Sequence, residues 1–312
     1  MQGDLAFVFP GQGSQRVGML AQAAQSSVEV RATFDEASQA LGYDLWDLVR
    51  RDDGERLGLT EYTQPALLTS SVALWRAWRA AGGATPGAMA GHSLGEFSAL
   101  CCAGVFELAD AVLLVRERGR AMQSAVPVGE GAMAAVLGLD DEPIMAICTA
   151  VAAELDAVLQ AVNFNAPGQV VIAGHAPAVD VAIGRLKDAG AKRAMALDVS
   201  APFHTSLMKP AGRRLAAALD ALELRTPSIP VMHNVHAEPE TDPRRIRDLL
   251  VEQISSPVGW TACVRALLAG GATRFVECGP GRVLGGLLRR IDRALACVSL
   301  EAPADLRAAA AA

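Results

Sequence analysis

The sequence predicts an α/β fold with a large part built on a mostly parallel β-sheet and a smaller inserted part with its own sheet. On both sides of the middle of the chain, short apolar runs alternate with helix-length segments, which is typical of strands joined by helical crossovers. Between them the order is strand, helix, two strands, helix, strand, the split βαβ pattern of a ferredoxin-like unit. We therefore assign 1–125 and 200–312 to the large part and 126–199 to the small one.

Composition narrows the possible functions. The 312 residues are 51% hydrophobic and 20% charged, which is enough for a substantial core and unlike a disordered chain. The net charge is −6 and no basic run stands out, so we do not expect nucleic acid as a partner. The first residues lack the pattern of a signal peptide, and no apolar run is long enough to span a membrane. Six cysteines without C-x-x-C or zinc-ligand spacing indicate a cytoplasmic protein without a metal site.

The first predicted strand covers 5–9 and ends in the loop Pro10-Gly11-Gln12-Gly13-Ser14-Gln15. This loop resembles a phosphate cradle, but it lacks the Lys-Ser/Thr pair of a P-loop, so we exclude nucleotide binding. It is either a plain strand-to-helix turn or a loop whose backbone N–H groups approach a ligand, because glycines flank Gln12. Helices follow over 29–41 and 64–75, the second with Thr63 as its N-cap and Pro65 in its first turn.

The next strand-to-helix junction reads G-x-S-x-G, with Ser93 at its centre. A serine on such a sharp turn exposes its hydroxyl at the sheet edge. The first N–H groups of the following helix then lie where an oxyanion can form. The same five residues are also compatible with an ordinary glycine-rich turn, so this pattern alone does not decide the function.

The helix predicted over 108–123 carries an arginine on its apolar face. Residues with the helical spacing of a buried stripe are Ala111, Leu114, Val115 and Met122, and Arg118 lies in the middle of that stripe. A guanidinium there needs an anionic partner or a path to solvent. It belongs either to a structural ion pair or to a receptor for a carboxylate, which an arginine binds through two parallel hydrogen bonds.

The remaining elements complete both parts. In the small part we predict strands over 132–137, 161–165, 169–173 and 192–199, and helices over 141–154 and 177–189. In the large part we predict a helix from 208, a strand over 229–232, helices over 243–253 and 260–269, a strand over 274–277 and a helix over 283–293. The alanine-rich residues from 307 onward are predicted to be a frayed tail.

A serine nucleophile needs a base, and we favour His204 among the five histidines. It follows a predicted strand, where α/β sheets present functional groups. The side chain of His92 should leave the turn in another direction, and His175 should be exposed at the start of a helix. His233 and His236 are expected at the surface or packed in a loop, without a third metal ligand. No acidic residue stands out as the third member of a triad, which disfavours a generic hydrolase.

Together, these residues resemble the malonyl-CoA:acyl carrier protein transacylases of fatty-acid synthesis, over essentially the whole chain. Seven motifs in this order carry the resemblance: Phe9-Pro10-Gly11-Gln12-Gly13-Ser14-Gln15, Thr63-Gln64-Pro65-Ala66, Gly91-His92-Ser93-Leu94-Gly95-Glu96, Arg118-Gly119-Arg120-Ala121-Met122-Gln123, Asn163-Phe164-Asn165-Ala166-Pro167-Gly168-Gln169-Val170, Pro202-Phe203-His204 and Glu277-Cys278-Gly279-Pro280-Gly281. The resemblance implies an α/β-hydrolase-like large part with a ferredoxin-like insertion.

The resemblance also implies roles for individual residues. Ser93 is the implied nucleophile and His204 the implied base, oriented by a main-chain carbonyl near Gln253 instead of a carboxylate. The implied oxyanion donors are the backbone N–H groups of Gln12 and Leu94. The residues implied to bind the malonyl carboxylate or to line or support its pocket are Arg118, Gln64, His92 and Asn163. Phe203 resembles the malonyl-selective pattern of related polyketide acyltransferase domains.

The function implied by the resemblance is ping-pong transfer of malonyl from malonyl-CoA to the phosphopantetheine thiol of acyl carrier protein, without a cofactor or metal. Separately from the resemblance, we expect a cytoplasmic protein from its cysteines, and a monomer. Residues proposed to dock the carrier are Lys187, Lys192, Arg193, Arg282, Arg289 and Arg290. The alternatives are a serine esterase or thioesterase and an acyltransferase serving polyketide synthesis or malonate decarboxylase. A non-catalytic carrier-binding module is disfavoured by the intact Ser93 and His204.

Overall fold

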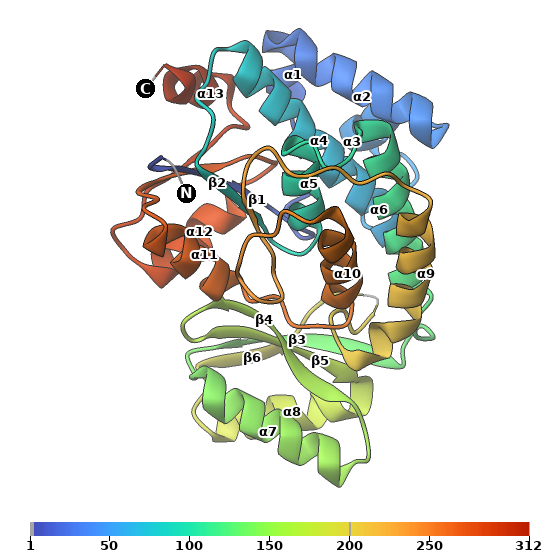
Figure 1. The fold of residues 1–312 in the computed structure, drawn as a ribbon. Helices are drawn as coiled ribbons and strands as arrows, with labels where there is room; N and C mark the ends of the chain where they lie inside the picture. Colours follow the sequence, from blue (N-terminus) through green and yellow to red (C-terminus); the bar gives the residue numbers. More distant parts are fainter. Residues whose placement is uncertain (1–2, 200, 312) are drawn as a thin grey trace.

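The computed structural model describes residues 3–199 and 201–311 and contains two sheets, which confirms the predicted α/β class (Figure 1). The larger sheet is entirely parallel, in the order β7 (Val231–Met232), β2 (Ala88–Gly91), β1 (Leu5–Phe9), β8 (Arg274–Glu277), β9 (Cys297–Ser299). The smaller sheet is antiparallel, and its strands all lie within 131–196. The proposed boundary at residue 200 falls outside the described residues, and the division at 125/126 and 199/200 stays a prediction.

Strand β1 is central in the large sheet and buried on both faces. Phe7 and Phe9 point into one core, and Ala6 and Val8 point into the other, because successive side chains of a strand alternate between faces. The first core is closed by α2 (Val28–Leu41), α4 (Thr60–Ala80), α5 (Leu94–Cys102) and α6 (Leu108–Gln123). The second is closed by α11 (Trp260–Ala269) and α12 (Val283–Ile291).

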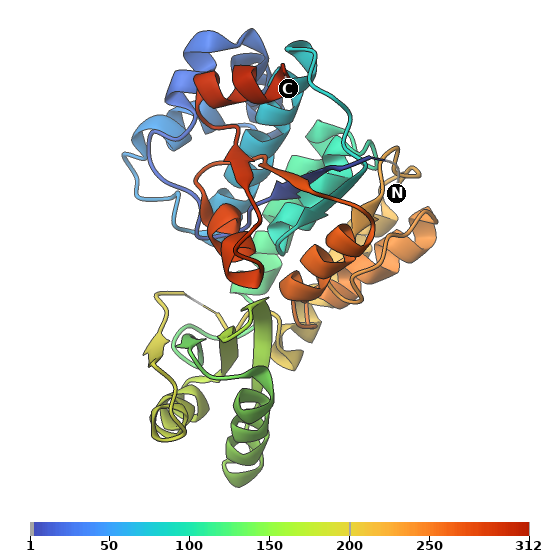
Figure 2. The ribbon, with the colours of Figure 1, turned by 90° about the vertical axis from the view of Figure 1, so that its left-hand side faces the viewer.

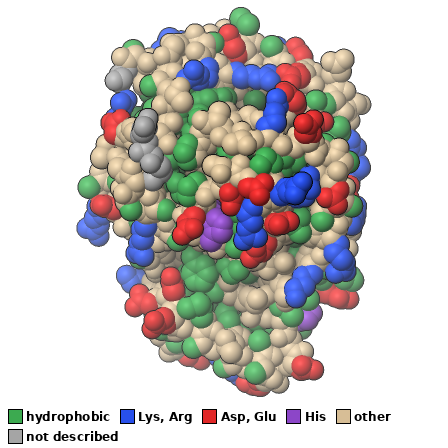
Figure 3. Space-filling view, in the orientation of Figure 1, with side chains coloured by type: hydrophobic (Ala, Val, Ile, Leu, Met, Phe, Trp, Pro, Cys, Tyr) green, Lys and Arg blue, Asp and Glu red, His purple; other side chains and the backbone are tan. Residues whose placement is uncertain are grey.

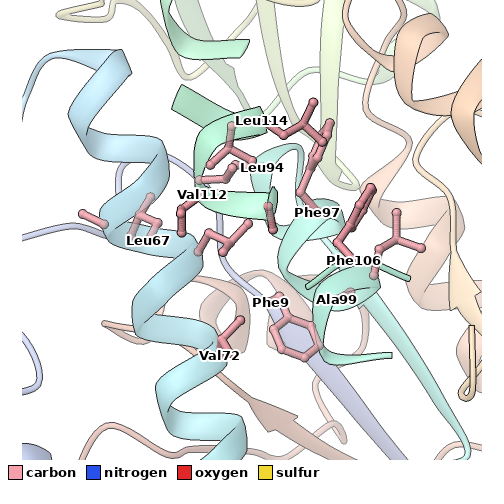
Figure 4. Close-up of a cluster of buried hydrophobic side chains, with 14 of the residues drawn as sticks. Phe9, Leu67, Val72, Leu94, Phe97, Ala99, Phe106, Val112 and Leu114 are labelled. Carbon is pink, nitrogen blue, oxygen red and sulfur yellow. The ribbon is translucent and has the colours of Figure 1, made fainter. Parts of the chain in front are cut away.

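Helix α5 lies inside the first core, between the sheet and the other helices. Figure 4 shows Phe97 of α5 next to Leu114 of α6 and Phe106, with Leu67 of α4 on the other side of the same cluster and Phe9 of β1 below it. Each of these side chains is at most 4% exposed. Burying a large apolar side chain contributes about 1.5–3 kcal/mol, so this packing fixes the start of α5 relative to the sheet edge.

The small part has the strand order β4-β5-β3-β6 expected of a ferredoxin-like unit. Its elements are β3 (Gly131–Leu137), α7 (Asp141–Glu154), β4 (Leu159–Ala166), β5 (Gln169–His175), α8 (Ala176–Asp188) and β6 (Arg193–Ala196). Both helices lie on the side of the sheet away from the large part (Figures 1 and 2). Strand β4 is bonded to the large part, because Phe164 N–H donates to Val258 O (3.0 Å) and Val258 N–H to Val162 O (2.8 Å).

The remaining elements surround the large sheet. They are α1 (Ala21–Ser26), α3 (Leu45–Arg51), a 3₁₀ turn (Ser206–Met208), α9 (Lys209–Asp220), α10 (Pro243–Gln253) and α13 (Pro303–Ala310). The predicted bounds of α6, α7, α10, α11 and β8 are confirmed. Within the described part of the chain, no helix is both long and apolar enough to cross a bilayer.

Three predictions about local structure are wrong. Helix α4 begins at Thr60 with Leu59 as N-cap, and the Thr63 hydroxyl instead donates to Leu57 O at 2.6 Å. Packing of this long buried helix outweighs the bond lost at Pro65. The predicted tail forms α13, since Pro303 suits a first helical position, Leu306 is buried and alanine favours helix. Strand β6 ends at 196, not 199, where its pairing with β3 stops.

Candidate active site

The G-x-S-x-G residues form a sharp turn between β2 and α5. Ser93 is the N-cap of α5 with φ 52° and ψ −107°, a backbone conformation that costs about 1–3 kcal/mol for a non-glycine residue. Both glycines are required by close backbone contacts. A Cβ on Gly91 would lie 1.9 Å from Gly95 C, and a Cβ on Gly95 would lie 2.0 Å from Phe9 O.

Asn234, in the loop after β7, holds this strained turn from the side. The Ser93 N–H donates to Asn234 Oδ1 at 2.8 Å, and Asn234 Nδ2 donates to Gly91 O at 2.7 Å. The side chain is 1% exposed, so these bonds do not compete with water. Sequence reasoning missed Asn234, and no local pattern marks it, because it lies 141 residues from the serine that it contacts.

Ser93 and His204, placed far apart in the sequence, are hydrogen-bonded in the structure. Ser93 Oγ lies 2.8 Å from His204 Nε2, and His204 Nδ1 lies 2.9 Å from the main-chain O of Gln253. A carbonyl oxygen only accepts, so Nδ1 carries the proton and Nε2 is free to accept from the serine hydroxyl. The main-chain carbonyl therefore orients the imidazole as the carboxylate of a triad would.

Burial keeps His204 neutral. Its ring is enclosed, and desolvation followed by the positive charge of Arg118 lowers the pKa of His204 from 6.5 to about 3. The hydrogen bond to Gln253 opposes this shift. At neutral pH the imidazole is thus unprotonated and able to act as a general base.

Arg118 lies in the middle of the buried face of α6, as the helical spacing predicted, and its guanidinium reaches Ser93. Its side chain is 2% exposed. Nη1 donates to Gln64 Oε1 at 2.9 Å, and Nη2 donates to Gln253 Oε1 at 2.9 Å and to Ser93 Oγ at 3.2 Å. No partner of the guanidinium in these bonds is a carboxylate, so it is ready to bind an anionic ligand.

The guanidinium of Arg118 stays protonated although it is buried. Desolvation lowers the pKa of Arg118 from 12.5 to about 10, and the negative charge of Glu96 opposes that shift. The guanidinium also lies 5.0 Å from the centre of the Phe97 ring, a favourable cation–π distance. Arg118 is therefore a cation at physiological pH, beside a serine and a neutral histidine.

These groups face a cleft of about 600 Å³ between the two parts of the chain. Its lining includes the predicted residues Gln12, His92, Ser93, Leu94, Arg118, Asn163, Phe203 and His204, together with Met122 and Met133. Gln64 and Gln253 are buried and contact Arg118. Leu94 is the first residue of α5, whose first N–H groups lack an acceptor within the helix. The Gln12 side chain donates to Thr60 Oγ1 at 3.0 Å, which steadies its loop.

The other histidines have structural contacts. His92 Nε2 lies 2.7 Å from Asn165 Oδ1, and burial lowers the pKa of His92. His233 is not at the surface, one of the two positions expected for it; it is fully buried with Nδ1 2.7 Å from Glu96 Oε1. His236 is exposed. His175 directly precedes α8 as predicted, but it is half-buried and not exposed, and its Nδ1 accepts from Val158 N–H at 3.0 Å. Among residues 3–199 and 201–311, no cluster of three His, Cys, Asp or Glu side chains forms a potential metal site.

Comparisons with known proteins agree with this geometry. Residues 6–294 match the family described as the acyl transferase domain. The chain is 54% identical over 304 residues to the malonyl CoA-acyl carrier protein transacylase of Salmonella typhimurium, covering 97% of this chain and 98% of that protein. The solved transacylase from Coxiella burnetii superposes with a TM-score of 0.97 at 46% identity, covering 99% and 97% of the two chains. A type II PKS acyl-carrier protein in complex with its malonyl-transacylase gives 0.97 at 49% identity, covering 99% of each chain.

Proposed function

The chain belongs to the acyl transferase family, and from this we propose that it transfers malonyl from malonyl-CoA to the phosphopantetheine thiol of acyl carrier protein in fatty-acid biosynthesis. The observation that carries the proposal is the position of Arg118, whose Nη2 lies 3.2 Å from Ser93 Oγ in a buried pocket. An acyl group that ends in a carboxylate places that carboxylate against this cation when its thioester carbonyl is at Ser93.

In the first half-reaction, Ser93 Oγ attacks the thioester carbonyl carbon while its proton moves to His204 Nε2. The backbone N–H groups of Gln12 and Leu94 stabilise the resulting oxyanion, and loss of one such donor typically costs about 100- to 1,000-fold in rate. The C–S bond then breaks, and the coenzyme A thiolate takes the proton from His204. Malonyl-Ser93 and free coenzyme A are the products.

In the second half-reaction, the carrier's thiol gives its proton to His204 as its sulfur attacks the malonyl-Ser93 ester. The oxyanion again forms at the same donors. When the ester C–O bond breaks, Ser93 recovers its proton from His204. Each half-reaction returns His204 to its neutral state, so the cycle needs no cofactor or metal, and one substrate leaves before the next reacts.

Arg118 selects the acyl group. With malonyl bound, the guanidinium exchanges neutral partners for a carboxylate, whereas with acetyl bound it keeps a buried charge without an anion. A site built for a charged group rejects an analogue that lacks it, because its own polar groups then stay unpaired. Phe203, 7% exposed at the cleft wall, limits the space beside the acyl group.

We place carrier docking at a basic cleft at the edge of the small part. This cleft, of about 610 Å³, is lined by Lys192, Arg193, Arg289, Arg290 and Arg293 without an acidic residue. Of the other predicted cations, Arg282 pairs with Asp305 instead, and Lys187 lies on α8 outside this lining. By contrast, the face in Figure 3 mixes both signs of charge. A local basic surface attracts an acidic carrier although this chain has a net charge of −6.

The basic cleft and the catalytic cleft are joined by β6. Arg193 begins that strand, and Leu197 to Val199, which follow it, line the catalytic cleft. Five residues of extended chain span about 16 Å. A carrier bound at the cations thus needs a long flexible arm to present its thiol at Ser93, which phosphopantetheine provides.

Two further expectations belong to this proposal. The six cysteines are all free thiols, which supports a reducing cytoplasm as the location. We also expect a monomer in solution, which analytical ultracentrifugation tests. The solved relative in complex with a type II PKS acyl-carrier protein favours a second candidate, an acyltransferase that supplies polyketide synthesis by the same chemistry.

Product analysis tests the proposed function against hydrolysis. With radiolabelled malonyl-CoA and holo acyl carrier protein, the label should appear on the carrier. Release as free malonate at the same rate without carrier would instead identify a thioesterase. Comparing fatty-acid and polyketide carriers at equal concentration then separates the two acyltransferase candidates by kcat/KM.

A further inference from the structure

A buried carboxylate, Glu96, lies directly behind the candidate active site. Glu96 is in the first turn of α5, three residues after Ser93, and is 0% exposed. Its Oε1 lies 2.7 Å from His233 Nδ1. Its Oε2 accepts from Asn234 N–H at 2.9 Å and from Gln253 Nε2 at 2.8 Å. The hydrogen bonds of His204 go to Ser93 and the main-chain O of Gln253 and not to Glu96, so Glu96 is not the third member of a triad.

The side-chain amide of Gln253 can satisfy the hydrogen bonds of its neighbours in only one orientation. Its nitrogen faces two groups that only accept, Glu96 Oε2 at 2.8 Å and Ser93 O at 3.1 Å. Its oxygen faces Arg118 Nη2, which only donates, at 2.9 Å. Reversal of this amide would place NH₂ against a guanidinium and oxygen against a carboxylate.

The other anchor of Arg118 is held much less firmly. Gln64 Oε1 accepts from Arg118 Nη1, but the nitrogen of that amide faces the sulfur of Met122 at 4.0 Å. A thioether is a weak acceptor. The position of the guanidinium therefore depends mainly on Gln253, and the orientation of Gln253 depends on the carboxylate behind it.

We propose that Glu96 is a positioning residue for acyl-group selection, which fixes the side-chain amide of Gln253 and through it the guanidinium of Arg118. This inference rests on the proposed function, since Arg118 must be the malonyl receptor for its position to matter. The opposing effect of Glu96 on the pKa of Arg118 shows that the two charges also interact, so the test must separate geometry from charge.

Two substitutions of Glu96 separate the effect of its position from the effect of its charge. Glu96→Gln removes the charge but keeps an oxygen for Asn234 and Gln253, while its NH₂ donates to His233 Nδ1 once the imidazole carries its proton on Nε2. Glu96→Asp keeps the charge but withdraws the carboxylate by one carbon–carbon bond, about 1.5 Å, which breaks a 2.8 Å contact. Measured by single-turnover acylation of Ser93, we expect the malonyl-CoA to acetyl-CoA ratio of rates to fall about tenfold in E96D and to stay within about threefold of native in E96Q.

Matched controls come from a second buried carboxylate. Glu277 is 1% exposed and accepts from Leu284 and Gly285 N–H, both at 2.9 Å, at the start of α12. E277D and E277Q should lower the melting temperature without changing the acyl-group ratio. A ratio that tracks the melting temperature across all four variants would reduce Glu96 to a structural role and overturn the proposal.

The remaining outcomes are also decisive. A larger fall of the malonyl-to-acetyl ratio in E96Q than in E96D would show that Glu96 affects selection through its charge and not through the position of Gln253, and would overturn the proposal. An unchanged malonyl-to-acetyl ratio in both variants would show that Glu96 has no part in acyl-group selection. If the native protein itself shows no preference for malonyl, the proposed function fails, but labelling of Ser93 by a fluorophosphonate still decides the role of Glu96. We expect E96D to slow that labelling at least threefold and E96Q to leave it unchanged, because the side-chain nitrogen of Gln253 also donates to Ser93 O, and the main-chain O of the same residue contacts His204 Nδ1.

Discussion

Replacement of Arg118 by alanine tests how the cleft chooses its acyl group. In the native protein the guanidinium is 2% exposed and 3.2 Å from Ser93 Oγ. With malonyl bound, it is expected to give two charge-assisted hydrogen bonds to the carboxylate. Each is worth about 1.5–3 kcal/mol, so the variant should lose about 3–6 kcal/mol of stabilisation, or about 100- to 20,000-fold in kcat/KM. Acetyl-CoA offers no carboxylate and should lose little.

Rapid-quench measurement of radiolabelled acyl-Ser93, with malonyl-CoA and acetyl-CoA in parallel, gives both rates for the same folded protein. Arg116→Ala is the matched control. That arginine is on the same helix, donates to Leu41 O at 3.2 Å and lies over the Tyr43 ring, so its loss should leave the malonyl-to-acetyl ratio unchanged. Equal losses for the two substrates in Arg118→Ala would refute carboxylate recognition and reduce Arg118 to a structural cation.

Three further predictions concern the base, the turn and the docking surface. Because burial and Arg118 lower the pKa of His204 to about 3, the acid limb of the pH profile for acylation should lie near pH 3, not near the ordinary 6.5. The unfolded chain binds the extra proton over this window, so His204 should also make stability fall as the pH drops from 6.5 to 3; a limb near 6.5 would contradict the burial argument. Asn234→Ala should slow acylation by malonyl and acetyl alike, by about 10- to 100-fold, since each buried group left unpaired costs about 1–3 kcal/mol; a selective loss for one substrate would contradict this. Arg289→Glu with Arg290→Glu should raise KM for the carrier severalfold and leave KM for malonyl-CoA unchanged, and an unchanged carrier KM would move docking elsewhere.

Helical periodicity in the sequence predicted which helices carry the residues of the site more accurately than it predicted where those helices begin. The apolar stripe around Arg118 predicted α6 and the burial of its one charged member, because an amphipathic face is a local property. The N-cap of α4 was misplaced, because burial of that helix outweighed the signals at Thr63 and Pro65. The fold of the small part followed from element order alone, which local patterns encode.

The contacts behind the cleft were not predictable from sequence patterns. Glu96 meets Gln253 across 157 residues of chain and His233 across 137, and neither pair has a spacing that repeats or a recognisable motif. Asn234 looked like an ordinary loop residue until the sheet placed β7 beside β2. Tertiary structure, and not local propensity, brings these polar groups together, and burial then makes each of their hydrogen bonds necessary.

The central claim is that malonyl passes through an ester on Ser93. Mass spectrometry of peptides, after brief exposure of the native protein to malonyl-CoA without carrier, tests it most directly. We expect one malonyl group on the peptide that contains Ser93, its discharge on addition of holo acyl carrier protein, and no adduct in Ser93→Ala. An adduct that persists in Ser93→Ala, or malonyl transfer to the carrier at the native rate by that variant, would contradict the account.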